Sequence, residues 1–190
     1  MVAGKGYHDA TVTGICAAAG VSRRTFYSYF SSKQDCVLRV FDDVLDFLIG
    51  AVEDAAPEEA GWPMKVRARI AALLELLAAN PDLVRFLLLA PIRAGDTIAD
   101  HHRTRLSSLL DCLLDGIDGY PQAERPSPAI EQALLGGMVA LMGKRAEEGE
   151  GGKLPGLLPD LVELVLTPYV GRAEAERASV AGKSYSEPQR

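Results

Sequence analysis

The stretch Gly6–Lys33, GYHDATVTGICAAAGVSRRTFYSYFSSK, decides how the chain begins to fold. Thr11 is placed to cap a short helix whose apolar residues recur three or four apart, and Gly20 supplies the positive φ that ends it. Ser22 then caps a second short helix, in which two phenylalanines four residues apart share one face. Two short helices joined by a tight turn predict a helix-turn-helix motif.

The second of these helices carries side chains suited to DNA. Arg23 and Arg24 lie in its first turn, where a guanidinium can donate to guanine O6 and N7 in the major groove. Neighbouring hydroxyl groups and one ammonium are suited to phosphates. The predicted DNA-binding residues are Thr11, Ser22, Arg23, Arg24, Thr25, Tyr27, Tyr29 and Lys33. In the alternative interpretation, the tyrosines only pack and the arginine pair is a solvated surface.

Charge is distributed unevenly along the chain. The net charge is −6, which taken alone argues against a protein that coats nucleic acid. Residues 1–40, however, hold five Lys and Arg against two Asp, a net charge of +3, so that residues 41–190 carry −9. The sequence therefore predicts a small basic head on an acidic body.

The remaining sequence predicts further helices. Of the 190 residues 48% are hydrophobic and only 6% aromatic, and alanine and leucine are abundant, which favours an all-α fold over an all-β one. Apolar spacing predicts helices over 33–54, 62–79, 82–93, 98–117, 128–147 and 154–173. We expect a helix-turn-helix DNA-binding head over 1–45, a helical ligand-binding and dimerisation domain over 46–175, and a disordered tail over 176–190.

The last two predicted helices are apolar on two sides. In the final one, a row containing Leu158 and Val162 runs beside a row containing Leu157 and Leu161. A helix with two apolar faces needs two partners, so we expect one of them to be a second copy of the chain. The predicted dimer contacts are Leu135, Met138, Leu158, Leu161, Val162, Val165 and Tyr169.

The order of residues over Gly6–Lys33 closely resembles the N-terminal signature of the TetR family of transcriptional regulators. The resemblance lies in the turn AAAGVS at 17–22, the TxYxxF pattern at 25–30, and the SK at 32–33 that opens the next helix. It implies an all-helical homodimer with a three-helix DNA-binding head and a ligand-binding body. It also implies that the last two helices pack against their copies as a four-helix bundle.

The resemblance further implies a helix ahead of Gly4–Tyr7, where this sequence begins. In a three-helix head that helix covers Val12, Ile15 and Phe26, and leaving such side chains in water costs roughly 1.5 to 3 kcal/mol each. Two explanations stay open from the sequence. The true start lies upstream of Met1, or the chain is a variant whose head folds poorly and binds DNA weakly.

A histidine offers a candidate effector contact. His102 lies in the apolar row of its helix, as a core histidine satisfied by a neighbour or as a polar contact lining a cavity. A metal site with Asp96, Asp100 and His101 is geometrically awkward, because those three residues do not share that row. The predicted ligand-binding residues are Trp62, Phe86, His102, Met138 and Met142.

These patterns favour one function. No stretch approaches the roughly 18 to 20 apolar residues of a membrane span, and the three cysteines lack CxxC spacing, so we expect a cytoplasmic protein that contacts no membrane. We expect no catalytic residue, cofactor or metal, since motifs such as GxGxxG and HExxH are absent from the sequence. The prediction is a repressor that binds double-stranded DNA, at a palindromic operator, as a homodimer and responds to a small-molecule effector.

Two other functions remain as alternatives. One is a dimeric helical protein that binds a small molecule but lacks competent DNA binding, as a missing first helix would allow. The other is a metal-dependent helical-bundle enzyme, which rests only on the cluster of aspartate and histidine.

Overall fold

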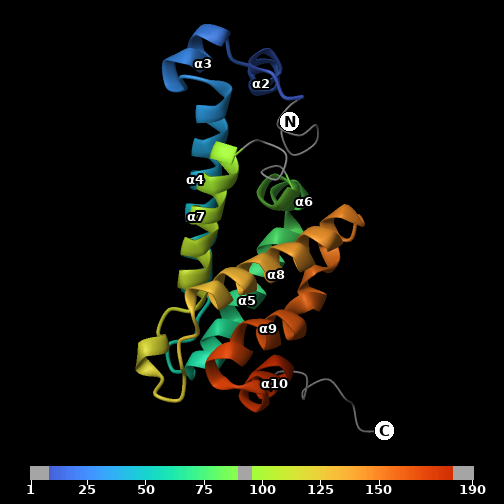
Figure 1. Ribbon diagram of the computed structural model, residues 1–190. Coiled ribbons are helices and arrows are strands. Elements are labelled where there is room, and N and C mark those ends of the chain that lie inside the picture. Colours follow the sequence, from blue (N-terminus) through green and yellow to red (C-terminus); the bar gives the residue numbers. More distant parts are fainter. Residues whose placement is uncertain (1–8, 90–95, 182–190) are drawn as a thin grey trace, which may run out of the picture.

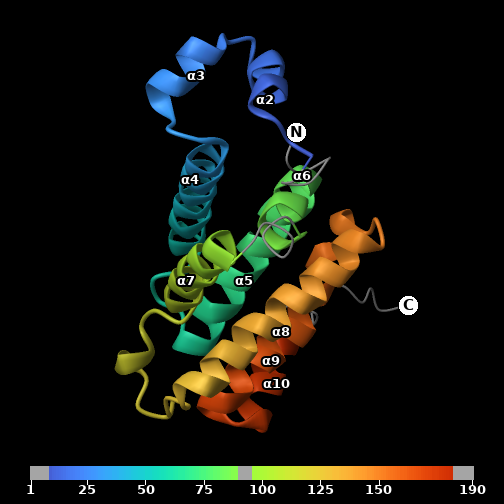
Figure 2. The same cartoon turned by 45° about the horizontal axis from the view of Figure 1, so that its top comes forward.

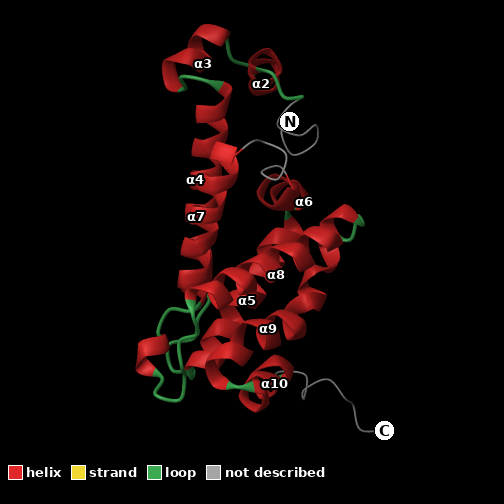
Figure 3. Cartoon of the chain, viewed as in Figure 1, coloured by secondary structure: helices red, strands yellow, loops and turns green. Residues whose placement is uncertain are grey.

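The computed structural model describes residues 9–89 and 96–181, and all regular elements in these ranges are helices (Figures 1 and 3). This confirms the all-α prediction. In chain order they are α2 (Val12–Ala19), α3 (Arg23–Tyr29), α4 (Lys33–Asp54), α5 (Trp62–Ala79), α6 (Pro81–Val84), the π-helix η1 (Arg85–Leu89), α7 (Asp96–Leu113), the 3₁₀-helix η3 (Ile117–Gly119), α8 (Pro128–Glu147), the 3₁₀-helix η4 (Gly151–Leu157), α9 (Leu158–Val170) and α10 (Arg172–Val180).

Local capping builds the head from α2 and α3. The Thr11 hydroxyl accepts a hydrogen bond from Gly14 N at 3.1 Å, and the chain leaves α2 at Gly20, whose φ of 68° lies in the left-handed region. The Ser22 hydroxyl accepts from Thr25 N at 3.0 Å and so starts α3. The predicted helix-turn-helix is therefore confirmed, and it stands at one end of α4 (Figure 1).

The long helix α4 joins the head to the body. Cys36 belongs to the small head cluster with Cys16 and Phe26, whereas Val37 and the buried residues after it belong to the body core. The expected end of the head at residue 45 differs from this packing, since the changeover between the two cores lies near the start of α4. The physical reason is that one continuous helix can present its first turn to one core and its later turns to another.

The body core surrounds α5. This helix contacts α4 on one side and α9 and α10 on the other (Figure 2). Two polar side chains anchor α5 to the end of α7: Trp62 Nε1 donates to the Leu114 carbonyl at 3.0 Å, and the buried Arg69 guanidinium donates to the Asp115 carbonyl at 2.7 Å. Such bonds satisfy carbonyls that would otherwise be buried without a partner.

The C-terminal run differs from the sequence prediction. The single helix expected over 154–173 is divided into η4, α9 and α10, with the break at Gly171, whose φ is 77°. The expected disordered tail is wrong for residues 176–180, because α10 continues to Val180 and buries Ala175 and Ala178. Small side chains give a weak hydrophobic signal in sequence but allow close packing on α9.

The helix expected over 82–93 also changes character. After α6 ends at Val84, the backbone continues as η1, a π-helix of five residues. Three predictions lie outside the described residues: the end of this helix over 90–93, the place of the first head helix before residue 9, and the tail over 182–190. Within the described ranges, no helix is both long enough and apolar enough to cross a membrane.

Candidate DNA-binding surface and effector pocket

The outer face of α3 presents the side chains predicted to bind DNA. Arg23, Arg24 and Thr25 are exposed, and Tyr27 and Tyr29 are 49% and 70% exposed. The core position of this helix is taken by Phe26 instead, which is 3% exposed. The structure therefore does not support the interpretation in which the tyrosines serve only as packing. The Arg23 guanidinium lies 5.9 Å from the centre of the Tyr27 ring.

The other predicted DNA contacts also have structural partners. The Thr11 and Ser22 hydroxyls cap α2 and α3, and the Thr25 hydroxyl lies 2.9 Å from that of Ser22. Lys33 Nζ donates to the Ala10 carbonyl at 2.9 Å, across the head. Lys33 thus holds the start of α4 against the start of α2, and its contact with a phosphate stays a prediction.

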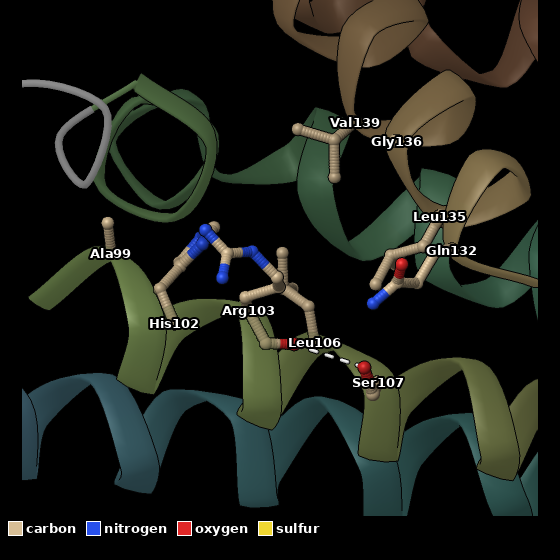
Figure 4. A pocket seen from close by; sticks show the side chains of 9 residues that line it. All are labelled: Ala99, His102, Arg103, Leu106, Ser107, Gln132, Leu135, Gly136 and Val139. Carbon is tan, nitrogen blue, oxygen red and sulfur yellow. Dashed lines mark hydrogen bonds between the residues drawn. The ribbon is translucent and has the colours of Figure 1, made fainter. Parts of the chain in front are cut away.

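An open cavity of about 530 Å³ lies between α7 and α8, large enough for a small-molecule site (Figure 4). Side chains from the two helices point toward one another across it. Its lining consists of Ala99, His102, Arg103, Leu106, Ser107, Gln132, Leu135, Gly136 and Val139. We call this space the outer pocket.

A narrow apolar gap in the body core lies next to the outer pocket. The gap holds only about 30 Å³ and shares Leu106, Leu135 and Val139 with the outer pocket. Its other walls include Met138 and Met142, together with leucines from α4, α5 and η1. The two spaces therefore place a polar rim beside a wholly apolar interior.

His102 connects the outer pocket to two other elements. Its Nε2 donates to the Leu87 carbonyl of η1 at 2.6 Å, and its ring centre lies 4.7 Å from that of Phe41 in α4. Burial lowers the pKa of His102, outweighing the opposite effect of the bond to Leu87, and so favours the neutral ring. His102 is a satisfied core histidine and a cavity-lining residue at once.

The described side chains of the aspartate and histidine cluster on α7 have separate partners. His102 bonds to Leu87, His101 Nε2 lies 2.8 Å from an Asp42 carboxylate oxygen, and Asp100 accepts from Arg103. Within the described part of the chain, no group of three or more His, Cys, Asp or Glu side chains is placed to hold a metal ion.

The other predicted ligand-binding residues do not all meet at His102. Met138 and Met142 line the inner gap, whereas Phe86 lies in a separate groove between the head, α4 and α6. Trp62 lines none of these three spaces; it packs against Tyr120 and Tyr169 at the far end of α5, and its role as a ligand contact stays a prediction. Arg103, Ser107 and Gln132 were missed, although the first two lie one and five residues after His102, on adjoining faces of α7.

Removal of the Trp62 hydrogen bond tests its structural role. We expect Trp62→Phe to lower the free energy of unfolding by about 1 to 3 kcal/mol, because the Leu114 carbonyl loses its buried donor. Urea denaturation followed by circular dichroism measures the change. The affinity for the effector should stay unaltered. A large loss of affinity in a folded variant would show that Trp62 contacts the ligand.

Most of the predicted dimer contacts lie inside the protomer. Five of them are each at most 2% exposed in the protomer and so offer no free surface to a second copy, which argues against their assignment to a dimer interface: Met138, Leu161, Val162, Val165 and Tyr169. Leu135 faces the pockets, and Leu158 is half-buried. The second apolar face of α9 has its partners within the same chain, namely α5 and α10.

Comparisons with known proteins agree with this architecture. Residues 1–40 match the family model described as bacterial regulatory proteins, tetR family. The fatty acid metabolism regulator protein of Bacillus subtilis (strain 168) is 31% identical over 134 residues, covering 70% of this chain and 67% of the relative. The HTH-type transcriptional activator FasR of Mycolicibacterium smegmatis is 29% identical over 83 residues, 44% of this chain and 38% of the relative.

Solved structures share the fold. The fatty acid degradation regulator FadR from Bacillus halodurans superposes with a TM-score of 0.74 and 23% identity, covering 87% of this chain and 91% of that one. FadR from Bacillus subtilis in complex with stearoyl-CoA gives a TM-score of 0.74 and 23% identity, covering 88% and 92%.

A helix-turn-helix head with an exposed second helix, joined to a helical body with a pocket, defines a DNA-binding transcriptional regulator that responds to a ligand. The chain belongs to the TetR family. The comparisons support this function over the alternative of a small-molecule binder without DNA binding, and both relatives are named as regulators rather than as enzymes.

Proposed function

We propose that the chain is a repressor that binds a palindromic operator as a homodimer and is released by a long-chain fatty acyl-CoA. The observation that carries the choice of effector is the outer pocket together with the adjoining apolar gap. An acyl-CoA joins an apolar chain to a large polar head, and the two spaces offer an apolar interior behind a polar rim. The stearoyl-CoA bound to FadR from Bacillus subtilis supports the same chemical class.

The rim of the outer pocket suits a phosphorylated head group. The Arg103 side chain is 64% exposed, and its guanidinium pairs with Asp100 at 2.9 Å, so it can turn to a ligand at little cost. Ser107 and Gln132 add hydrogen-bonding groups nearby. We assign the acyl chain to the inner gap, where the flexible Met138 and Met142 can shift to admit it.

The homodimer requires a surface other than the one expected from sequence. The outer face of α8 exposes Ile130 and Leu141 at 43% and 38%, with small residues such as Ala133 and Ala140 between them. Leu164 of α9 lies beside this face, where a Cβ on Gly137 would be 3.3 Å from its Cδ2. We assign the dimer interface to this face, because small residues let two helices approach closely.

Dimerisation sets the geometry of DNA binding. The two recognition helices of a symmetric dimer enter successive major grooves about 34 to 36 Å apart. An effector that binds more tightly to a dimer with a different spacing lowers the affinity for the operator. Repression and release then follow from one equilibrium between two arrangements of the protomers.

The effector can be tested on a duplex that the protein itself selects. The protein enriches its preferred duplex from random DNA, and fluorescence anisotropy then follows release of that duplex during titration with stearoyl-CoA. We expect stearoyl-CoA to weaken DNA binding by about 5- to 150-fold, the usual range of allosteric coupling. Coenzyme A and stearate, added separately, show whether both halves of the ligand are needed.

Two variants control this experiment. Val139→Trp fills the space that the outer pocket and the inner gap share, so operator binding should persist while the response to stearoyl-CoA is lost. Met64→Trp places the same ring on an exposed part of α5 and should respond as the wild type does. A wild-type protein that fails to bind stearoyl-CoA would refute the proposed effector class.

A further inference from the structure

One helix, α7, faces both the outer pocket and the helix that leads to the head. On one side, His102, Arg103 and Leu106 line the pocket. On another side, His101 and Arg105 pair with carboxylates of α4 (Figure 4 shows the pocket side). A displacement of α7 therefore also displaces α4, whose first turn belongs to the core of the head.

The contacts between α7 and α4 form a continuous polar ladder. Asp42 of α4 lies 2.8 Å from His101 Nε2 and 2.9 Å from Arg105 Nε, and Arg105 also pairs with Asp46 one turn further along α4. Beyond the ladder, Lys33 at the start of α4 donates to the Ala10 carbonyl in the head. α4 is thus held to α7 at its middle and to the head at its beginning.

Among the polar side chains of the pocket, His102 differs in where its bond goes. Arg103 and Ser107 bond within α7 itself, to Asp100 and to the Arg103 carbonyl. His102 instead crosses to η1, where it donates to the Leu87 carbonyl, and its ring packs on Phe41 of α4. One imidazole therefore contacts the pocket, the π-helix and α4 together.

The π-helix η1 is a suitable element to change its conformation when a ligand binds. Isolated π-turns are rare and often occur at functional sites. The Leu87 side chain also lines the inner gap, so a chain that enters the gap and a group that engages His102 both act on η1. The Phe86 ring lies 5.9 Å from that of Phe41, which ties η1 to α4 as well.

We propose that His102 is the positioning residue that transmits effector binding to the head, by giving up its hydrogen bond to Leu87 for one to the carbonyl oxygen of a bound acyl group. The proposal rests on the proposed function, since it assumes an acyl ligand in the outer pocket. When Nε2–H turns to the acyl oxygen, η1 loses its link to α7. The ring then leaves Phe41, and α4 changes its position together with the head.

Recognition by this route depends on one atom of the ligand. The carbonyl oxygen of a thioester accepts a hydrogen bond, whereas the corresponding S-alkyl thioether has the same chain and the same coenzyme but no acceptor at that position. The two ligands should bind the pocket comparably. Only the thioester should release the operator.

The experiment measures affinity and coupling separately. The Kd of stearoyl-CoA is determined for the free protein and for its complex with the selected duplex, and the ratio of the two is the coupling factor. His102→Phe keeps an aromatic ring beside Phe41 but has no N–H. We expect it to bind stearoyl-CoA within about threefold of wild type, with a coupling factor reduced to about 1 to 2.

Further variants separate this role from a merely structural one. His102→Gln retains an amide N–H near the position of Nε2 and should recover part of the coupling. Thr104→Ala alters the same helix outside the pocket and removes only a bond within α7, to the Asp100 carbonyl, so its coupling should equal that of the wild type. S-octadecyl-CoA, the thioether, should bind the wild-type protein and leave it on the operator.

The outcomes distinguish the two proposals. Absence of stearoyl-CoA binding to wild type would refute the effector class. Binding and release that are equal in wild type and His102→Phe would overturn only the role of His102. Release of the operator by S-octadecyl-CoA to the same extent as by stearoyl-CoA would also overturn it, because the carbonyl would then be unnecessary.

Discussion

Leu161→Glu should unfold the protomer and not merely separate a dimer. The Leu161 side chain is 0% exposed and lies in the body core between α9 and its neighbours, so the variant would bury a carboxylate among apolar side chains. We expect a loss of more than about 4 kcal/mol in the free energy of unfolding, a large fraction of the roughly 5 to 15 kcal/mol of a typical domain. Thermal melting followed by circular dichroism measures this loss.

Ala140→Glu provides the matched control. It introduces the same charged side chain on the exposed face of α8 that we assign to the dimer. The variant should melt cooperatively with native helix content but sediment as a monomer in analytical ultracentrifugation. A stable, folded Leu161→Glu protein that sediments as a monomer would contradict our assignment and show that the dimer interface lies on α9.

Arg24→Ala should reduce binding to the selected duplex by about 5- to 150-fold for each half-site, equivalent to about 1 to 3 kcal/mol. Arg24 is exposed in the first turn of α3, where a guanidinium in the major groove can donate to guanine O6 and N7. Binding to random DNA should change little, because phosphate contacts dominate it. Anisotropy titrations on both duplexes at several salt concentrations measure the difference.

Arg172→Ala removes one positive charge from the opposite end of the molecule. Arg172 is exposed on α10, which lies far from the head (Figure 1), and its guanidinium pairs with Glu176 on the same helix. Its affinity for both duplexes should equal that of the wild type. Equal losses for Arg24→Ala on selected and random duplexes would mean that Arg24 contacts the backbone of DNA and reads no base.

The head was predictable because its signals are local. The Thr11 and Ser22 caps and the glycine at position 20 act within a few residues of themselves, and the structure contains each of them where expected. The body was predictable in its helices but not in their partners. Two apolar rows on α9 indicate that two surfaces are covered, yet the rows are the same whether α10 or a second chain covers them.

The effector pocket was predictable only at one residue. His102 attracts notice because it is polar in an apolar row, whereas Arg103 and Ser107 look like ordinary surface residues of α7. Whether they face solvent or a cavity depends on how far α8 stands from α7, which is a tertiary property. Trp62 shows the converse, because its size and indole N–H suit a ligand site and a buried anchor equally well.

The changeover between cores within α4 limits how such regulators can be recombined. A chimera that joins one protein's head to another's body is usually cut at a loop, but here the described chain passes from head core to body core inside a continuous helix, between Cys36 and Val37. A cut after α4 would carry foreign side chains into the body core. The seam has to fall within the first turns of α4, so that Val37, Phe41 and Leu45 remain with the body they evolved to fill.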